Sequence, residues 1–270
     1  MRRCSIWPIL MTGAVALGGC SRIRRDAPTL PEAHTLVREQ LVIHSDFPLA
    51  TQHRLVEDVT ARRFDLARTL ALPVSNEPIH IYLFEDAAPF RAFIRAHHPE
   101  FSDRRALFVE TDTRLIVYAH WGDRVAEDLR HEVTHGYLHS IVPALPLWLD
   151  EGLAEYFEVR RGQDGMNRVH LDQLLARLDQ GQWRPDLERL ERFESAWDMT
   201  QEDYAESWAW VHFLLRSRVE HCELLQAYVE HLRREGAAAP MSLTLGRLPD
   251  QGGAALIEHL RRLGAEGHSA

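Results

Sequence analysis

Two histidines and a glutamate stand close together in the chain, in the order His131-Glu132-Val133-Thr134-His135. This is an H-E-x-x-H pattern within a stretch of helical periodicity. Residues four apart point the same way on a helix, so both imidazoles can reach one metal ion. Glu132 lies on a neighbouring part of that face, near enough to contact a water on the ion without being a ligand. Because the pattern is short, a helix whose polar face holds these residues by chance is the alternative.

A second segment lies one predicted helix downstream and reads Pro146-Leu147-Trp148-Leu149-Asp150-Glu151-Gly152-Leu153-Ala154-Glu155-Tyr156. Together the two segments resemble the gluzincin metallopeptidases, the thermolysin and aminopeptidase N group with a peptidase MA-like core. In that group a downstream helix carries an N-E-G-x-A-type segment whose glutamate is the third zinc ligand. The resemblance makes Glu151 that ligand, although Asp150 stands where many members have asparagine. It also makes Glu155 the acidic residue that orients a ligand histidine.

The resemblance implies one catalytic Zn²⁺ bound by His131, His135 and Glu151. Two histidines and one glutamate leave a fourth position open for water, whereas structural zinc sites are closed, usually by cysteines. Glu132 is then the general base, and the expected reaction is hydrolysis of a peptide bond by a zinc-activated water. Aminopeptidases of the group carry a G-x-M-E-N segment that binds the substrate amine, and nothing between residues 105 and 130 matches it. We therefore expect an endopeptidase that acts on peptides or proteins.

Three further side chains are weaker candidates. Tyr204 begins an apolar helical stretch and resembles the tyrosine that stabilises the oxyanion in aminopeptidase-type gluzincins. The residues after it depart from the family's Y-E-K-G-like pattern, so a tyrosine packed against the core is the alternative. His212, on the same stretch, competes for that role, but a single histidine on an apolar helix is more often buried. His139 does not fit metzincin spacing, and we favour packing over contact with a ligand residue.

The first 19 residues predict a lipoprotein signal peptide. Arg2 and Arg3 precede an apolar run that is too short to span a bilayer. The run ends in Leu17-Gly18-Gly19-Cys20, which resembles a bacterial lipobox, and this implies cleavage before Cys20 and lipidation of its thiol. Ser21, in place of an aspartate, favours the outer membrane, so the predicted location is the cell envelope on the periplasmic face. An uncleaved anchor and an ordinary signal peptide are the alternatives.

Composition sets broad limits on the rest of the protein. With 270 residues, 26% of them charged, the chain is long enough to bury a sizeable core. Its net charge is −9 and no basic run follows residue 25, so nucleic acid is not an expected partner. Cys4 leaves with the signal peptide and Cys20 carries the lipid, so Cys222 keeps the one free thiol of the predicted mature chain and no internal disulfide is expected.

The elements that must position the motif follow from periodicity and from breaker residues. Strands are predicted at residues 36–44, 79–84, 106–110 and 115–119, and helices at 48–72, 88–96, 123–140, 146–159, 204–216 and 219–233. Asp123 is the expected cap of the motif helix, and Leu115 to Ala119 is the expected edge strand along which a substrate adds. The predicted fold is α+β and zincin-like. A tether (20–35) leads to a mixed lobe with the motif helix (36–142), and a helical lobe (143–270) carries the third ligand.

Two other functions compete with proteolysis. One is a non-catalytic, lipid-anchored binding or scaffold protein of the same fold, although a pure binder needs no base such as Glu132. The other is a zinc hydrolase that acts on cell-wall peptides, because selectivity resides in pocket walls that no motif reports. The sequence indicates neither the physiological substrate nor the oligomeric state.

Overall fold

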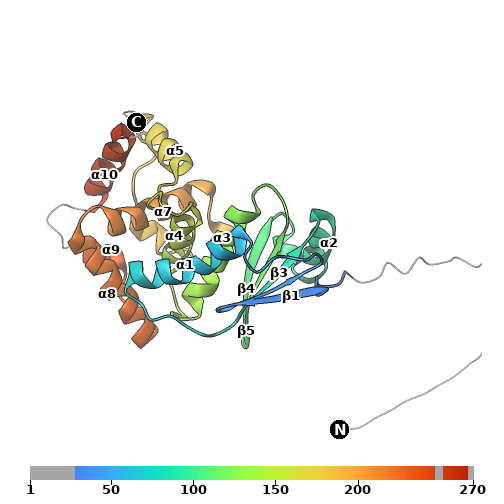
Figure 1. Cartoon of the computed structure of the whole chain (residues 1–270). Coiled ribbons are helices and arrows are strands. Elements are labelled where there is room, and N and C mark those ends of the chain that lie inside the picture. Colours follow the sequence, from blue (N-terminus) through green and yellow to red (C-terminus); the bar gives the residue numbers. More distant parts are fainter. Residues whose placement is uncertain (1–27, 247–251, 267–270) are drawn as a thin grey trace, which may run out of the picture.

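The computed structural model describes residues 28–246 and 252–266, and the predicted signal peptide with Cys20 lies outside this part of the chain. A five-stranded mixed sheet and several helices make up the fold, which is therefore α+β. Figure 1 shows the sheet on one side of the molecule and most of the helices on the other, with α3 between them. Within the described residues, no helix is long and apolar enough to cross a membrane.

The sheet is mixed, with parallel strands at its centre. Its members are β1 (His34–Arg38), β2 (Leu41–Ser45), β3 (Ile79–Phe84), β4 (Ala106–Thr111) and β5 (Arg114–His120). They lie in the order β1-β2-β3-β5-β4, where β3 pairs in parallel with β2 and β5, and β1 and β4 are antiparallel to their neighbours. The prediction that Leu115 to Ala119 forms the edge is wrong. That strand, β5, is enclosed by β3 and β4, and the two edges of the sheet are β1 and β4.

The first predicted strand is in fact a hairpin. The chain reverses between β1 and β2, and Glu39 in the turn has a φ of 50°, in the left-handed region. Only a few per cent of non-glycine residues adopt this conformation, so a glutamate there gave no turn signal. The first strand begins at His34, which lies inside the predicted tether.

The predicted helices are present with shifted ends, and further helices follow or lie between them, among them α5 and α10. Their bounds are α1 (Arg54–Leu70), α2 (Ala87–His97), η1 (Pro99–Phe101), α3 (Val125–His139), α4 (Leu147–Glu158), α5 (Arg168–Asp179), α6 (Leu187–Leu190), η2 (Ala196–Asp198), α7 (Gln201–Arg216), α8 (Val219–Glu235), α9 (Met241–Leu245) and α10 (Gly253–Glu266). The first of these begins six residues later than predicted. Asp123 does not cap α3, because Arg124 occupies the N-cap position and no side chain bonds there.

Alternation along the strands explains how the sheet is covered. Ile79 and Ile81 of β3 face the main core, which includes α1 and α3, whereas Tyr82 and Phe84 face a smaller core with α2. Successive side chains of a strand point to opposite faces, so one strand serves both cores. The motif helix α3 thus rests on the sheet with its apolar side and presents its polar side to α4.

The helices α4 and α7 approach each other closely at Gly152. A Cβ atom on Gly152 would lie 2.5 Å from the carbonyl oxygen of Ser207 and 2.8 Å from Cγ2 of Val211. The backbones of α4 and α7 therefore meet at a point where only glycine fits. The first of these helices carries Glu151 and the second carries Tyr204.

Candidate metal centre

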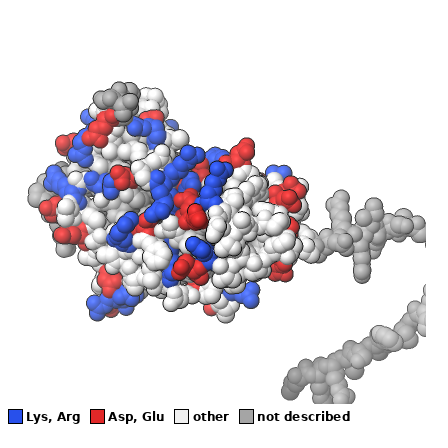
Figure 2. Space-filling model, in the orientation of Figure 1, with Lys and Arg blue, Asp and Glu red and all other residues white. Residues whose placement is uncertain are grey.

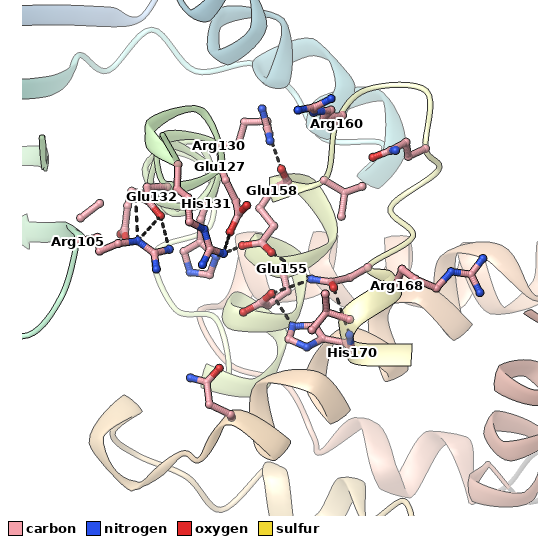
Figure 3. Close-up of a pocket in the computed structure, with 18 of the residues that line it drawn as sticks. Arg105, Glu127, Arg130, His131, Glu132, Glu155, Glu158, Arg160, Arg168 and His170 are labelled. Atoms are coloured by element: carbon pink, nitrogen blue, oxygen red, sulfur yellow. Dashed lines mark hydrogen bonds and ion pairs between the residues drawn. The ribbon is translucent and has the colours of Figure 1, made fainter. Parts of the chain in front are cut away.

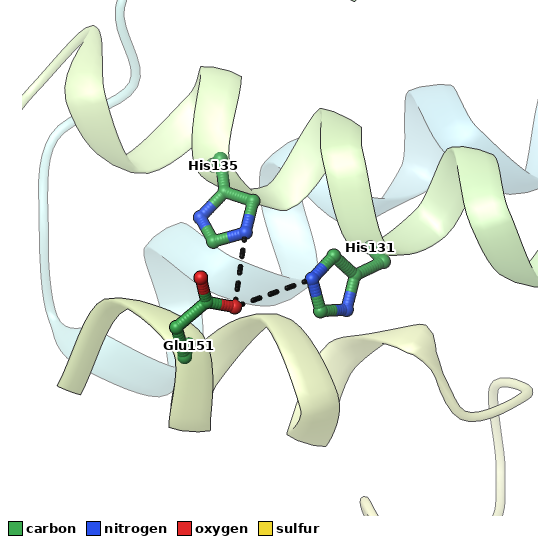
Figure 4. Close-up of side chains that lie close together, drawn as sticks. All are labelled: His131, His135 and Glu151. Carbon is green, nitrogen blue, oxygen red and sulfur yellow. Dashed lines mark ion pairs between the residues drawn. The ribbon is translucent and has the colours of Figure 1, made fainter. Parts of the chain in front are cut away.

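Three side chains from α3 and α4 converge on one point. Nε2 of His131 lies 3.4 Å from Oε2 of Glu151, and Nε2 of His135 lies 3.6 Å from the same oxygen. Figure 4 shows both imidazoles facing the carboxylate across the gap between the two helices. These three residues form a cluster that could hold a metal ion. The structure therefore brings together the three ligands that the sequence predicts.

The opposite nitrogen of each imidazole is held by a carboxylate. Nδ1 of His135 donates to Oδ1 of Asp150 at 2.9 Å, and Nδ1 of His131 donates to Oε2 of Glu158 at 3.1 Å. An ionised carboxylate only accepts hydrogen bonds, and the neighbouring histidines hold the pKa of Asp150 well below its usual range, so Nδ1 of His135 carries the proton. Burial raises the pKa of Glu158 to about 7, and Nδ1 of His131 donates to the ionised form of that carboxylate. Nε2 of each ring is then the nitrogen available for a metal. Carboxylate partners of this kind orient ligand histidines in metal sites and raise their basicity.

Asp150 belongs to a longer chain of contacts that reaches the surface. Its Oδ2 accepts from Nε2 of His139 at 3.0 Å, and Nδ1 of His139 donates to Oε2 of Glu110 at 2.6 Å. Both nitrogens of His139 face carboxylates, and both donate only in the charged imidazolium form. The favoured interpretation of His139, packing, does not describe these contacts. The alternative does, because His139 supports Asp150, which in turn contacts the predicted ligand His135.

Charge in the cluster favours bound cations. Burial alone would lower the pKa of His135, but Asp150 and Glu151 outweigh it and raise the pKa to about 10. Burial would raise the pKa of Glu151, but its close contacts with the two histidines and their charges lower it to about 2. A divalent ion beside Glu151 would take the place of the proton on Nε2 of each histidine. Its binding would therefore displace protons from the histidines.

Glu132 lies beside the cluster without joining it. Its Oε2 accepts from the backbone N–H of Phe108, in the edge strand β4, at 2.7 Å. Burial raises the pKa of its carboxyl group, and His131 and His135 oppose this shift through their charges. A raised pKa brings a carboxylate closer to the range in which a general base is efficient at neutral pH.

Tyr204 lies on α7 and contacts Arg104, in the segment before β4. Nη2 of Arg104 donates to the Tyr204 hydroxyl oxygen at 3.1 Å. Burial raises the pKa of the phenol, and the charge of Glu151 raises it further. The hydroxyl therefore keeps its own proton, which is free to be donated elsewhere.

Glu155 does not have the contact that the resemblance implies. Its Oε2 accepts from Nε2 of His170 at 2.8 Å and from Nδ2 of Asn167 at 3.4 Å. Glu158, three residues on, contacts the ligand histidine instead. Glu158 and Glu151 are seven residues apart, two turns on one face of α4, and this spacing was the signal that could have identified it.

His212 lies in the helical packing between α7 and α10. Its Nδ1 is 2.9 Å from Nε2 of His259, and its ring packs against Trp208. The side chain is buried, and none of the metal-binding clusters in the described residues includes it. Its contacts thus support the interpretation of a packed histidine.

A cavity of about 720 Å³ opens beside the metal-binding cluster. His131 and Glu132 line it from α3, and Glu155 and Glu158 line it from α4 (Figure 3). Arginines surround these acids, and on the face drawn in Figure 2 the two signs of charge are interspersed. The cavity gives a substrate access to the His131 side of the cluster.

Residues 126–237 match a family described as "Protein of unknown function (DUF1570)". The matched stretch covers less than half of the chain, from the start of α3 to just beyond α8. It contains the three cluster residues, Glu132 and Tyr204, whereas the sheet and Arg104 lie outside it. A comparison with curated proteins finds no match. The family description names no activity, so the chemistry has to be argued from the site.

Proposed function

We propose that this protein is a zinc-dependent metallopeptidase of gluzincin type with a zincin-like fold. Its peptide or protein substrates bind in the cavity beside the metal centre. The observation that carries the proposal is the convergence of His131, His135 and Glu151 next to the carboxylate of Glu132. A purely structural metal site has no use for an additional carboxylate between the cluster and the cavity. The missing amine-binding segment supports cleavage within a chain rather than at a free amino terminus.

The donor set fits zinc. Oε2 of Glu151 is buried and makes no hydrogen bond among the described residues, and both Nε2 atoms face it. Ligands about 2.0–2.1 Å from a tetrahedral zinc lie about 3.4 Å from one another. The separations of 3.4 and 3.6 Å agree with that value. Two imidazoles and one carboxylate are also the donors of catalytic zinc sites.

The residues around the metal have distinct tasks in hydrolysis. Bound zinc supplies a Lewis acid that polarises a carbonyl and lowers the pKa of water to about 7. Glu132 takes the proton of the attacking water and passes it to the leaving amine. Tyr204 donates its hydroxyl proton to the carbonyl oxygen as negative charge develops there. Asp150 and Glu158 keep the two histidines oriented throughout.

Two measurements on purified protein test the proposal. Metal analysis should find one zinc per chain, and His131→Ala, His135→Ala and Glu151→Ala should each lose most of it. Hydrolysis of casein, peptide libraries and cell-wall fragments should be abolished by a chelator and restored by zinc. Glu132→Gln should retain zinc and lower the rate by at least ~10²-fold, because it keeps the volume and removes the base. A wild type that cleaves nothing, together with a Glu132→Gln variant that retains the cellular role, would instead support the scaffold function.

We also propose that the protein is anchored in the cell envelope by a lipid on Cys20, on the periplasmic side and with preference for the outer membrane. The support is the lipobox-like Leu17-Gly18-Gly19-Cys20. Cys20→Ala should abolish both lipidation and partition with membranes. Mass spectrometry that finds another mature amino terminus would refute this location.

A further inference from the structure

An arginine without an acidic partner lies at the edge of the cavity. Arg105, Arg124 and Arg130 also line the cavity, and each forms an ion pair with an aspartate or a glutamate. Arg104 is exposed, and it has no carboxylate within ion-pair distance in the described part of the chain. Its guanidinium therefore retains donors that face solvent in the same cavity as His131 and Glu132.

Two contacts fix the position of this arginine. Arg104 donates to the hydroxyl of Tyr204, which lies on α7. Nearby, the rings of Phe101 and Trp197 stack with centroids 4.8 Å apart and an interplanar angle of 27°. Both contacts join residues 101–104, just before the edge strand, to residues 197–204 at the start of α7. The guanidinium is thus held against the rest of the site although it is exposed.

The arginine lines the same cavity as His131 and Glu132. Burial alone would lower its pKa, but the Tyr204 hydroxyl and the charges of Glu132 and Glu151 raise it. A guanidinium with free parallel donors matches a carboxylate in a two-point contact. Such a contact would form a short distance from the bond that Glu132 and the metal act on.

We propose that Arg104 binds a carboxylate of the substrate and makes the protein selective for peptides that carry one beside the scissile bond. This inference rests on the proposed peptidase function. The carboxylate belongs either to an acidic side chain or to the carboxyl terminus of the peptide, because the two groups have the same chemistry. By holding Tyr204 at the same time, Arg104 couples recognition of the substrate to the position of the hydroxyl.

The test compares peptides that differ only in this group. One arm scans glutamate against glutamine through an alanine-rich peptide, and the other compares free with amidated carboxyl termini. For the zinc-loaded wild type, kcat/KM should favour the carboxylate in at least one arm, and the favoured arm identifies its source. Arg104→Gln should lower this preference by ~10- to 10²-fold, the range for a charge-assisted, two-point contact. Arg104→Lys should restore part of it, because the charge remains and the fork is lost.

Arg168→Gln is the matched control. Arg168 lines the same cavity and has no ion pair among the described residues, but it begins α5 on the far side of Glu155. Its substitution should leave the preference unchanged. An equal loss in both variants would mean that the general charge of the cavity is responsible, and this would overturn the assignment to Arg104. So would a fall in kcat on all peptides with the preference unchanged, since Arg104 would then only position Tyr204.

Measurements of peptide binding distinguish a failure of this inference from a failure of the proposed peptidase function. Dissociation constants of the same peptides are measured with zinc-loaded Glu132→Gln, with and without Arg104→Gln. Carboxylate-dependent binding that disappears with Arg104→Gln supports the inference even if the wild type cleaves no peptide. Cleavage of peptides without any carboxylate preference, in rate or in binding, overturns the inference and leaves the peptidase function in place. Zinc content and melting temperature show whether each variant is folded.

Discussion

Asp150 should control the affinity of the protein for the proposed zinc ion, although it is not one of the three proposed ligands. It accepts from Nδ1 of His135 at 2.9 Å and from Nε2 of His139 at 3.0 Å, so both of its oxygens are engaged. Asp150→Ala removes the group that fixes the proton on Nδ1 and keeps Nε2 directed at the metal. Loss of such a partner typically costs ~10- to 100-fold in metal affinity. This corresponds to about 1.4–2.7 kcal/mol.

Asp150→Asn is the informative control. The amide oxygen can accept from Nδ1 of His135, and the amide NH₂ can donate to Nε2 of His139 if that ring keeps its proton on the Glu110 side. Only the negative charge is lost, and a neutral hydrogen bond is roughly half as strong as a charge-assisted one. We therefore expect a loss of affinity below ~10-fold.

Competition with a chromogenic chelator at one fixed neutral pH measures the zinc dissociation constant of each variant. Thermal unfolding of the zinc-free proteins shows whether the substitution acts on the fold instead. An Asp150→Ala protein with wild-type affinity would refute the reasoning that orientation of His135 limits binding. Equal losses for alanine and asparagine would refute the narrower claim that hydrogen bonding rather than charge is what counts.

Three other predictions concern separate contacts. Glu158→Gln should weaken zinc binding by several-fold or more, whereas Glu155→Gln should change it less, because only Glu158 contacts a proposed ligand histidine. Chelator competition measures both affinities, and a larger loss for Glu155→Gln would make Glu155 the residue that orients the histidine. Tyr204→Phe should lower kcat by ~10- to 10³-fold with zinc content and melting temperature nearly unchanged, and an unchanged kcat would remove the hydroxyl from the reaction. Burial lowers the pKa of His212 to about 3 and that of His259 to about 4, so the unfolded chain binds more protons below pH 6.5 and stability falls as the pH drops towards those values. Replacing both with glutamine should reduce the slope of unfolding free energy by up to about 1.4 kcal/mol per pH unit for each histidine, and denaturant titrations that give the wild-type slope would contradict this.

Sequence patterns predicted the strands and helices whose residues follow a clear hydrophobic periodicity or a β-branched and aromatic run. The ends of β3 agree with its run of β-branched and aromatic residues, and those of β4 and β5 lie within one residue of the prediction. The hairpin between β1 and β2 was missed because a glutamate occupies its left-handed turn position. The order of strands was not predictable, since pairing of β5 with β3 depends on contacts between distant residues.

The site was predictable where its residues follow one another along a helix. His131, His135 and Glu151 come together because each pair of neighbours is set by helix spacing or by one helix-to-helix contact. Glu110 and Arg104 were not predicted, because each reaches its partner from another part of the chain. Arg104 is 100 residues from Tyr204, and no periodicity links positions so far apart.

Gly152 shows that a motif can report on space as well as on chemistry. Its Cβ position is occupied by the backbone of Ser207, so even alanine would force α4 and α7 apart. The glycine that follows Glu151 therefore binds nothing and moves no proton. It sets the depth at which the third ligand sits beneath the motif helix. The glycine in this pattern therefore reports the spacing between two helices, which the ligand residues alone do not.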